Sequence, residues 1–441
     1  MAAPRISRRA ALGGLAASFA APALFRRHAL AAPSETVRHA SFGASGMALA
    51  DVRSLASHPN FKLVAVADVD LKRTGEIKSL FPDVKIYQDW RKLLDEEKGL
   101  DSVNVSTPDH MHAPIGMSAL QRGLHVYGQK PLTQTIYEAR RLTEVAAQNP
   151  KLVTQMGIQI HSHAVHRQVV ATIQSGAIGA VKEVHSWSGK QWGDRNPRPA
   201  GADPVPEGLD WEGWLGVASS RPYLGKGYYH PGNWRKRLDF GTGTFGDMGC
   251  HILDPVYESL ALTAPKTVRS DGDAPGEDSW GLDVRVHYVF PKTPHTAEEL
   301  VLHWYNGGNR PPEEIKSHLG GRELSSQGSI YIGSEGVLYS PYIDTPVLFP
   351  VDKFKETKLP DPGGSNHWHQ FVNACRGEGK TSAPFAYAGP LTETVLLGCL
   401  STRYPGTTLE WDPAGLKVTN VPEASPFIRK KYRAGWEVEG L

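Results

Sequence analysis

One stretch near the amino terminus decides the fold: residues 37–56, which read VRHASFGASGMALADVRSLA. Its first part, Val37–Phe42, predicts a strand, and the amphipathic run Met47–Ala56 predicts a helix. The loop between them places Gly43 and Ala48 at the first and third positions of the dinucleotide fingerprint G-x-G-x-x-G/A. Strand, loop and helix in this order indicate a dinucleotide site at a helix N-terminus.

The rest of this loop and the end of the next strand indicate which dinucleotide is bound. Ser45 stands where the fingerprint has its second glycine, and Gly46 and Met47 follow it, so we expect all three to line the cofactor. Asp68 ends the second predicted strand and is the acid expected at the ribose hydroxyls, which favours NAD. Arg73 keeps NADP open, and Asp68 as a cap of the following helix is the structural alternative.

Apolar runs alternate with amphipathic runs as far as about Gly157, which predicts a doubly wound parallel sheet. The predicted strands are Val37–Phe42, Phe61–Ala67, Ser102–Val105, Leu124–Tyr127 and Leu152–Met156. The predicted helices are Met47–Ala56, Leu71–Phe81, Ile115–Arg122 and Ile136–Ala147. We expect a Rossmann domain over residues 35–160.

The pattern changes after about His163, and residues 161–441 are expected to form a second, closely joined domain. Longer apolar runs there resemble the strands of a mostly antiparallel sheet: Asp283–Phe290, Glu299–Tyr305 and Ser329–Ile332. The predicted helices of this part are Val165–Ser175, Trp368–Cys375 and Leu391–Leu400.

The first 31 residues read as a secretory signal of the twin-arginine type. Ser7-Arg8-Arg9 precedes an apolar run, and Ala29-Leu30-Ala31 offers small residues to a signal peptidase. A membrane anchor is the alternative, but the run is short and rich in alanine. We therefore expect a protein that is periplasmic or otherwise exported, free of the membrane after cleavage, with a cofactor that travels bound and is regenerated in place.

Composition excludes two other classes of site. The formal net charge of +2 gives no basic surface for nucleic acid. Cys250, Cys375 and Cys399 are an odd, scattered set that lacks both a disulfide framework and the spacing of a zinc site. We expect no metal.

The segment GTGTFGDMGCHILD, residues 241–254, places Asp247 and His251 four residues apart. If it is helical, both side chains lie on one face and can reach one bound molecule. An acid beside an imidazole suits proton transfer, and it also suits a metal site. The structural alternative is a helix N-terminus with a core histidine.

Two further segments follow predicted strands, at the edge where doubly wound sheets bind ligands. Residues 106–112 read STPDHMH, and we expect Thr107, Pro108 and His112 to contact the cofactor. Residues 128–132 read GQKPL, and Gln129 and Lys130 are expected there too. A solvated turn lysine is the alternative for Lys130, although the proline after it favours an extended backbone aimed into a cleft.

Together these motifs resemble the Gfo/Idh/MocA oxidoreductase family over nearly the whole chain after the signal. The signal, Asp210-Trp211 and the closing residues 432–436, YRAGW, resemble a secreted branch of it. The resemblance implies a Rossmann domain followed by an α/β domain. The large open sheet of that second domain forms the substrate wall and often an oligomer interface. We therefore expect a homo-oligomer.

The resemblance also implies oxidation of a ring hydroxyl on a sugar or cyclitol. Lys130, Asp247 and His251 match the family's catalytic positions. His251 would accept the hydroxyl proton, Lys130 would stabilise the oxygen, and Asp247 would orient substrate or imidazole. Gln129 departs from the family's usual glutamate, which removes a negative charge beside Lys130 and leaves the direction and rate of hydride transfer open.

A carbohydrate substrate would need further contacts, for which we expect His161, His163, Trp192, Tyr229 and Arg235. The two histidines follow the last Rossmann strand, with a polar loop or a metal site shared with His251 as alternatives. The leading hypothesis is an NAD(P)-dependent oxidoreductase with a retained, recycled cofactor. The alternatives are a redox-neutral, NAD-dependent glycoside-cleaving enzyme and a non-catalytic sugar-binding protein.

Overall fold

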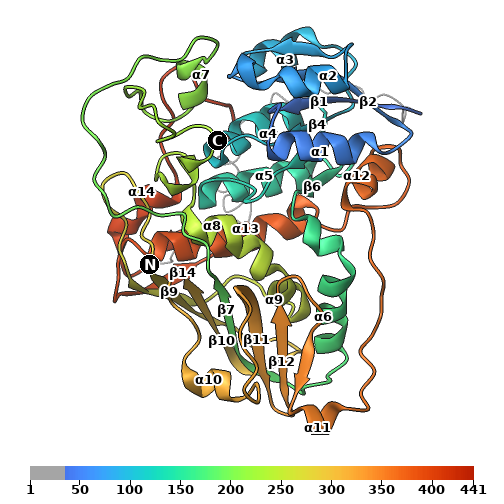
Figure 1. The fold of residues 1–441 in the computed structure, drawn as a ribbon, viewed down its shortest axis with the longest axis vertical. Helices are drawn as coiled ribbons and strands as arrows, with labels where there is room; N and C mark the ends of the chain where they lie inside the picture. The colour runs from blue at the N-terminus through green and yellow to red at the C-terminus, as the bar shows by residue number, and fades with distance from the viewer. Residues whose placement is uncertain (1–34) are drawn as a thin grey trace, which may run out of the picture. The chain divides into compact units, whose positions relative to one another are not determined.

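A parallel sheet forms the first part of the protein, whose computed structural model describes residues 35–441. Its strand order is β3-β2-β1-β4-β5-β6, and Figure 1 labels β1, β2, β4 and β6 of this sheet. The strands are β1 Val37–Phe42, β2 Phe61–Ala67, β3 Lys85–Tyr87, β4 Ser102–Val105, β5 His125–Gly128 and β6 Thr154–Met156. Every neighbouring pair is parallel, which confirms the predicted doubly wound sheet.

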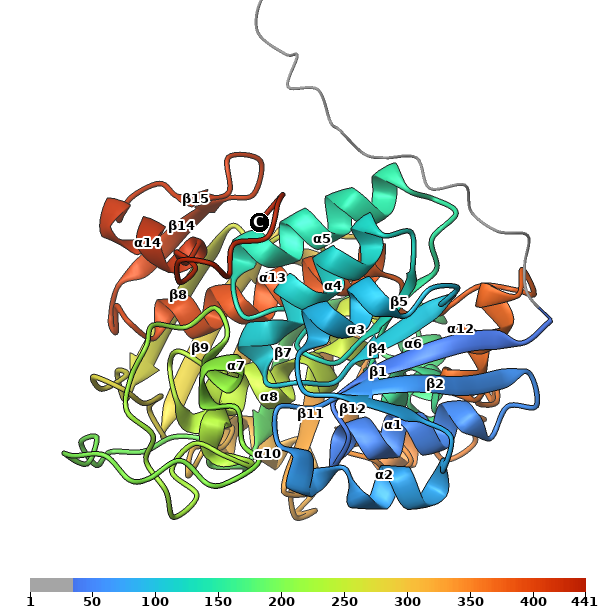
Figure 2. The same cartoon turned by 90° about the horizontal axis from the view of Figure 1, so that it is seen from above.

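Helices lie on both faces of this sheet (Figure 2). They are α1 Met47–Ala56, α2 Gly75–Leu80, α3 Trp90–Glu96, α4 His112–Gln121 and α5 Ile136–Gln148. The single helix expected over Leu71–Phe81 is wrong. A 3-10 turn, η1 Leu71–Arg73, comes before α2, because the regular helical structure is interrupted at Thr74. The sequence analysis missed β3 and α3, which are both short.

A second sheet of mixed strands follows, in the order β13-β12-β11-β7-β10-β9-β8-β14-β15. Its strands are β7 Val181–Ser188, β8 Thr267–Gly272, β9 Val284–Phe290, β10 Thr296–Asn306, β11 Gln327–Gly333, β12 Val337–Pro341, β13 Val347–Phe349, β14 Thr408–Asp412 and β15 Lys417–Val418. All neighbours pair antiparallel except β7 and β10. The expected mostly antiparallel sheet is confirmed.

The remaining helices follow the first sheet along the chain. They are α6 Ala164–Gln174, α7 Trp211–Leu215, α8 Gly243–Ile252, α9 Asp254–Ser259, α10 Glu313–Ser317, α11 Val351–Phe354, α12 His367–Cys375, α13 Phe385–Ser401 and α14 Ser425–Ile428. Short 3-10 turns are η2 Asp109–Met111, η3 Gln159–Ser162, η4 Asn233–Lys236 and η5 Pro422–Ala424. None of the helices in residues 35–441 has the length and apolar character that a bilayer crossing needs.

Late helices tie the two sheets together. The longest, α13, packs against α5 beside the first sheet and against α8 beside the second. Near it, α12 packs on α1, where Phe371 joins Val37 and Tyr127 in one buried cluster. The described residues accordingly form one compact unit, and the boundary at residue 160 stays a prediction. The predicted signal lies outside the described residues.

Phe371→Ala should lower the free energy of unfolding by about 3–5 kcal/mol, because it leaves a cavity among fully buried side chains. Leu80→Ala is the control, since Leu80 is 46% exposed and its loss should cost less than about 1 kcal/mol. Urea unfolding of both variants measures the difference. Equal losses would show that α12 is not part of the first domain's core.

Candidate active site

Helix α8 is buried along its whole length and carries the paired acid and imidazole. Its start needs glycine: Gly243 has a φ of +67°, and a Cβ there would lie 2.8 Å from the ring of Trp280. Asp247 and His251 are four residues apart on this helix, as the spacing predicted. Both side chains line a cavity of about 400 Å³.

Lys130 reaches this helix from the end of β5. Its Nζ donates to Oδ1 of Asp247 at 2.7 Å and to the carbonyl oxygen of the same residue at 2.9 Å. Arg235 from η4 donates through Nε to the same Oδ1 at 3.2 Å. Two cations from distant segments therefore meet one buried carboxylate.

Electrostatics fix the charge state of this pair of helix residues. Burial alone would raise the pKa of Asp247, but Lys130 and Arg235 hold it well below its ordinary value. Burial, assisted by the positive charge of Lys130, lowers the pKa of His251 to about 3. Its Nδ1 is buried and has no hydrogen-bond partner within residues 35–441. At neutral pH the imidazole is therefore uncharged, and one of its nitrogens keeps a lone pair.

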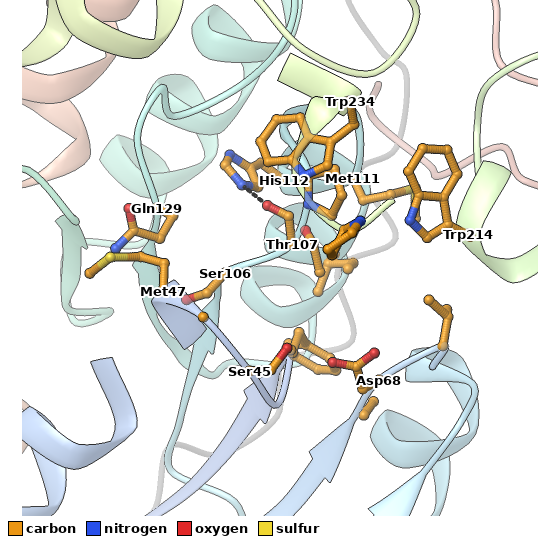
Figure 3. A pocket seen from close by; sticks show the side chains of 18 of the residues that line it. Ser45, Met47, Asp68, Ser106, Thr107, Met111, His112, Gln129, Trp214 and Trp234 are labelled. Carbon is orange, nitrogen blue, oxygen red and sulfur yellow. Dashed lines mark hydrogen bonds between the residues drawn. The ribbon is translucent and has the colours of Figure 1, made fainter. Parts of the chain in front are cut away.

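A second cavity, of about 330 Å³, opens at the carboxyl edge of the first sheet (Figure 3). All ten residues predicted for the cofactor line it: Gly43, Ser45, Gly46, Met47, Asp68, Thr107, Pro108, His112, Gln129 and Lys130. Lys130 and Arg235 line both cavities. The two cavities therefore adjoin at the lysine.

The second cavity fits a dinucleotide on two independent observations. Gly43 has a φ of +110°, and a Cβ there would lie 2.8 Å from the Cβ of Ala48 and 2.9 Å from the carbonyl oxygen of Ser106. The loop is therefore too tight for any residue but glycine here, as the first position of the dinucleotide fingerprint requires. Thr107 Oγ1 and Trp90 Nε1 are also buried at this cavity without a hydrogen-bond partner among the described residues.

Asp68 and Ser45 form hydrogen bonds within the protein. The Asp68 carboxylate accepts from the backbone N–H of Ala44 and of Asp70, both at 2.9 Å, so it holds the glycine loop against the end of β2. Burial raises its pKa. Arg73 donates through Nε to Oγ of Ser45 at 2.9 Å and lies at the same cavity.

His112 joins the two predicted loops to each other. One ring nitrogen lies 2.8 Å from the carbonyl oxygen of Thr107 (Figure 3), and the other lies 2.8 Å from the carbonyl oxygen of Pro131. Burial lowers the pKa of His112 to about 4. The neutral ring has one N–H, so it donates to one of these two carbonyl oxygens at a time.

The Gln129 side chain contacts the carboxyl group of Asp51, a residue that the sequence analysis did not select. Its Nε2 donates to Oδ2 of Asp51 at 2.8 Å. Ser106 and Trp368 donate to the same carboxyl. Burial raises the pKa of Asp51 to about 6, although these hydrogen bonds oppose the rise. The sequence signal that could have found Asp51 was an acidic residue on the buried face of a predicted helix.

Of the five residues expected at the substrate, the structure brings only Trp192 and Arg235 to the cavity that contains His251. Tyr229 is fully buried against Trp211, Trp214 and Phe240, where packing leaves it no ligand-facing surface. That placement corrects the expectation for Tyr229.

The two histidines after β6 also lie outside the linings of both cavities. His163 is exposed and caps α6 by accepting from the N–H of Val165. His161 is buried against Asp254. The cavity that contains His251 is instead completed by side chains that the sequence analysis did not select: Lys190, Met248, Gln327 and Tyr342.

The first sheet is parallel and carries a glycine loop at its carboxyl edge, and a lysine, an aspartate and a histidine meet between it and the second sheet. These features are typical of the class of NAD-binding oxidoreductases. Residues 37–156 match the Gfo/Idh/MocA oxidoreductase family's NAD-binding Rossmann fold, and residues 167–438 match the family's C-terminal alpha/beta domain. The chain belongs to the Gfo/Idh/MocA family.

Curated relatives match part of the chain. An inositol 2-dehydrogenase of Rubrobacter xylanophilus is 28% identical over 129 residues, 29% of this chain and 37% of the relative. A dTDP-3,4-didehydro-2,6-dideoxy-alpha-D-glucose 3-reductase of Streptomyces antibioticus is 31% identical over 153 residues, 34% of this chain and 46% of the relative. The match spans less than half the length of either relative.

A solved structure matches over more of the chain. The WlbA dehydrogenase of Bordetella pertussis, solved with NADH and UDP-GlcNAcA, has a TM-score of 0.61 at 13% identity. The alignment covers 86% of this chain and 99% of that one. At this identity the likeness establishes the fold.

Gln129→Glu should destabilise the protein more at pH 8 than at pH 5. At pH 5 the Asp51 carboxyl is largely protonated and can donate to the new side chain, whereas at pH 8 two carboxylates would share one buried site. We expect a loss of about 1–3 kcal/mol at pH 8, measured by urea unfolding.

Gln134→Glu is the matched control, because Gln134 accepts from Nζ of Lys430 and a new charge there has a cation beside it. A loss for Gln129→Glu that is equal at both pH values would contradict the buried contact with Asp51.

Proposed function

We propose that the protein is an NAD-dependent oxidoreductase that acts on a ring hydroxyl of a sugar or cyclitol and keeps its cofactor tightly bound between turnovers. One observation carries the proposal: Lys130 is held by Asp247 where the dinucleotide cavity meets the cavity that contains His251. The relatives named above act on cyclitol or deoxysugar rings by name, which supports this substrate class.

Proton transfer falls to His251 in this proposal. Its ring is neutral and lines the cavity, so the imidazole can accept a hydroxyl proton. Lys130 then donates a hydrogen bond to the substrate oxygen as negative charge develops there. Asp247 holds the ammonium in place and shares its Oδ1 with Arg235, so these three groups carry a net positive charge.

The cofactor would lie along the glycine loop, with Asp68 and Arg73 near its adenosine half and Lys130 near its reactive half. When bound, the nicotinamide supplies a hydride acceptor. Trp192 offers the substrate a ring face and a buried Nε1 without a partner in residues 35–441. An indole of this kind suits the apolar face and the hydroxyls of a sugar.

Location and assembly complete the proposal. We propose export of the folded protein by the twin-arginine route, supported by the sequence before residue 32 alone. We also propose a homo-oligomer formed through the second sheet. Light scattering of the mature protein tests the second point, and a monomer at micromolar concentration would contradict it.

Replacing His251 with alanine should lower kcat by about 10²–10⁴-fold, because a positioned base is lost. The affinity for NAD, measured by fluorescence titration, should change little, since His251 lies outside the dinucleotide cavity. His163→Ala is the control and should keep nearly full activity. If the His251→Ala variant stayed active, the imidazole would have no role in the reaction.

Substrate class is tested by offering cyclitols, free sugars and aryl glycosides to the purified protein without added NAD. We expect free ring hydroxyls to be oxidised, with reduced nicotinamide appearing in proportion to bound cofactor. Release of the aryl group without net reduction would instead establish redox-neutral glycoside cleavage. Sugar binding without either reaction would contradict an enzymatic role.

A further inference from the structure

Four side chains converge outside both cavities, where η3, α6 and α9 pack together. They are His161, His166, Asp254 and Glu258. The two imidazoles and Asp254 are buried, and the Glu258 side chain is 37% exposed at the edge of the cluster. The proposed oxidoreductase activity uses none of them.

The spacing of their polar atoms resembles a ligand set. Nδ1 of His161 lies 3.0 Å and 3.1 Å from the two carboxylate oxygens of Asp254. The same Nδ1 lies 3.7 Å from Oε2 of Glu258, and Nδ1 of His166 lies 3.4 Å from Oδ2 of Asp254. A tetrahedral ion bound at about 2.0–2.1 Å separates its ligand atoms by about 3.3–3.4 Å, so little movement is needed to receive one.

An unpartnered nitrogen points into this cluster. Nδ1 of His166 is buried and makes no hydrogen bond in the part of the chain that the structure describes, although Asp254 lies beside it. The other nitrogen of that ring lies 2.8 Å from Oε2 of Glu258. Such a buried nitrogen needs an explanation, and a bound ion would supply one.

The charges of the cluster also favour a bound cation. Two carboxylates face two imidazoles, and one of the carboxylates is fully buried. The site therefore attracts positive charge, which a proton or a metal ion can provide.

We propose that His161, His166 and Asp254 bind a divalent transition-metal ion, for which Zn²⁺ is the appropriate probe. Two imidazoles and one carboxylate are an established type of donor set for Zn²⁺. Glu258 stays on the other nitrogen of His166 and fixes that ring, and Tyr387 supports Asp254 by donating to its Oδ1 at 2.5 Å. The expectation of no metal weighed cysteine spacing and a site shared by His161, His163 and His251, and this set is neither.

The three ligands come from separate segments of the chain, so the ion holds these segments together. It joins η3, which follows the last strand of the first sheet, to α6 and α9. Asp254 begins α9 three residues after His251, so the ion also anchors the carboxyl end of the helix that carries the base. Removing it should lower thermal stability before it changes the chemistry of the site.

The test uses full-length mature protein without a histidine tag, stripped with EDTA and titrated with Zn²⁺ by calorimetry. We expect about one tightly bound ion per chain, confirmed by elemental analysis after dialysis. Glu258→Gln should weaken binding more than tenfold and remove the rise in melting temperature that Zn²⁺ gives the parent protein. Glu258 is partly exposed, so this variant should fold, as circular dichroism will verify.

Two controls locate the ion. His163→Gln changes an exposed neighbour outside the cluster and should bind Zn²⁺ normally. Glu183→Gln changes a separate group on the second sheet, where Glu183 faces His185 and His303, and should also bind normally. Loss of binding in Glu183→Gln but not Glu258→Gln would place the ion on the sheet and overturn the proposal. No tight binding by the parent protein would show a hydrogen-bonded network only.

Discussion

The buried contact between Lys130 and Asp247 is the interaction on which the rest of the site depends. Neither group would be stable alone at this depth, because desolvation of a lone ion costs several kcal/mol. Each is retained because the other is present, with Arg235 sharing the same carboxylate oxygen. The pair joins the carboxyl end of β5 in the first sheet to helix α8 beside the second. The place where a cofactor meets a substrate is therefore set by an ion pair between distant segments.

A second constraint is that the imidazole beside this pair must remain neutral. His251 is buried and faces the positive charge of Lys130, and both effects disfavour imidazolium. A neutral ring that lines the cavity is what proton abstraction from a hydroxyl requires. The same lysine thus stabilises an oxygen anion and keeps the neighbouring base ready. Gln129, the neighbour of Lys130, adds no charge because its amide is neutral, and its Nε2 donates to Asp51.

Much of this arrangement could be predicted from the sequence, and the limits have physical causes. The first sheet was predictable because buried parallel strands are short apolar runs with helices between them, and the ten cofactor positions follow from the edge where such strands end. The pairing of Asp247 with His251 followed from helical spacing. Short elements such as β3 carry too little pattern to find. Tyr229 was misplaced because an aromatic residue in a loop reads the same whether it faces a sugar or a core. Lys190, Gln327 and Tyr342 lie on segments far apart in the chain that only the folded second sheet brings together.

The most direct measurement is a crystal structure of the protein with NAD and a cyclitol or sugar bound. We predict that the reacting hydroxyl oxygen lies within hydrogen-bond distance of both Lys130 Nζ and the His251 ring, with the nicotinamide against the same ring carbon. A sugar bound away from this pair, or a dinucleotide that does not follow the Gly43 loop, would contradict the account.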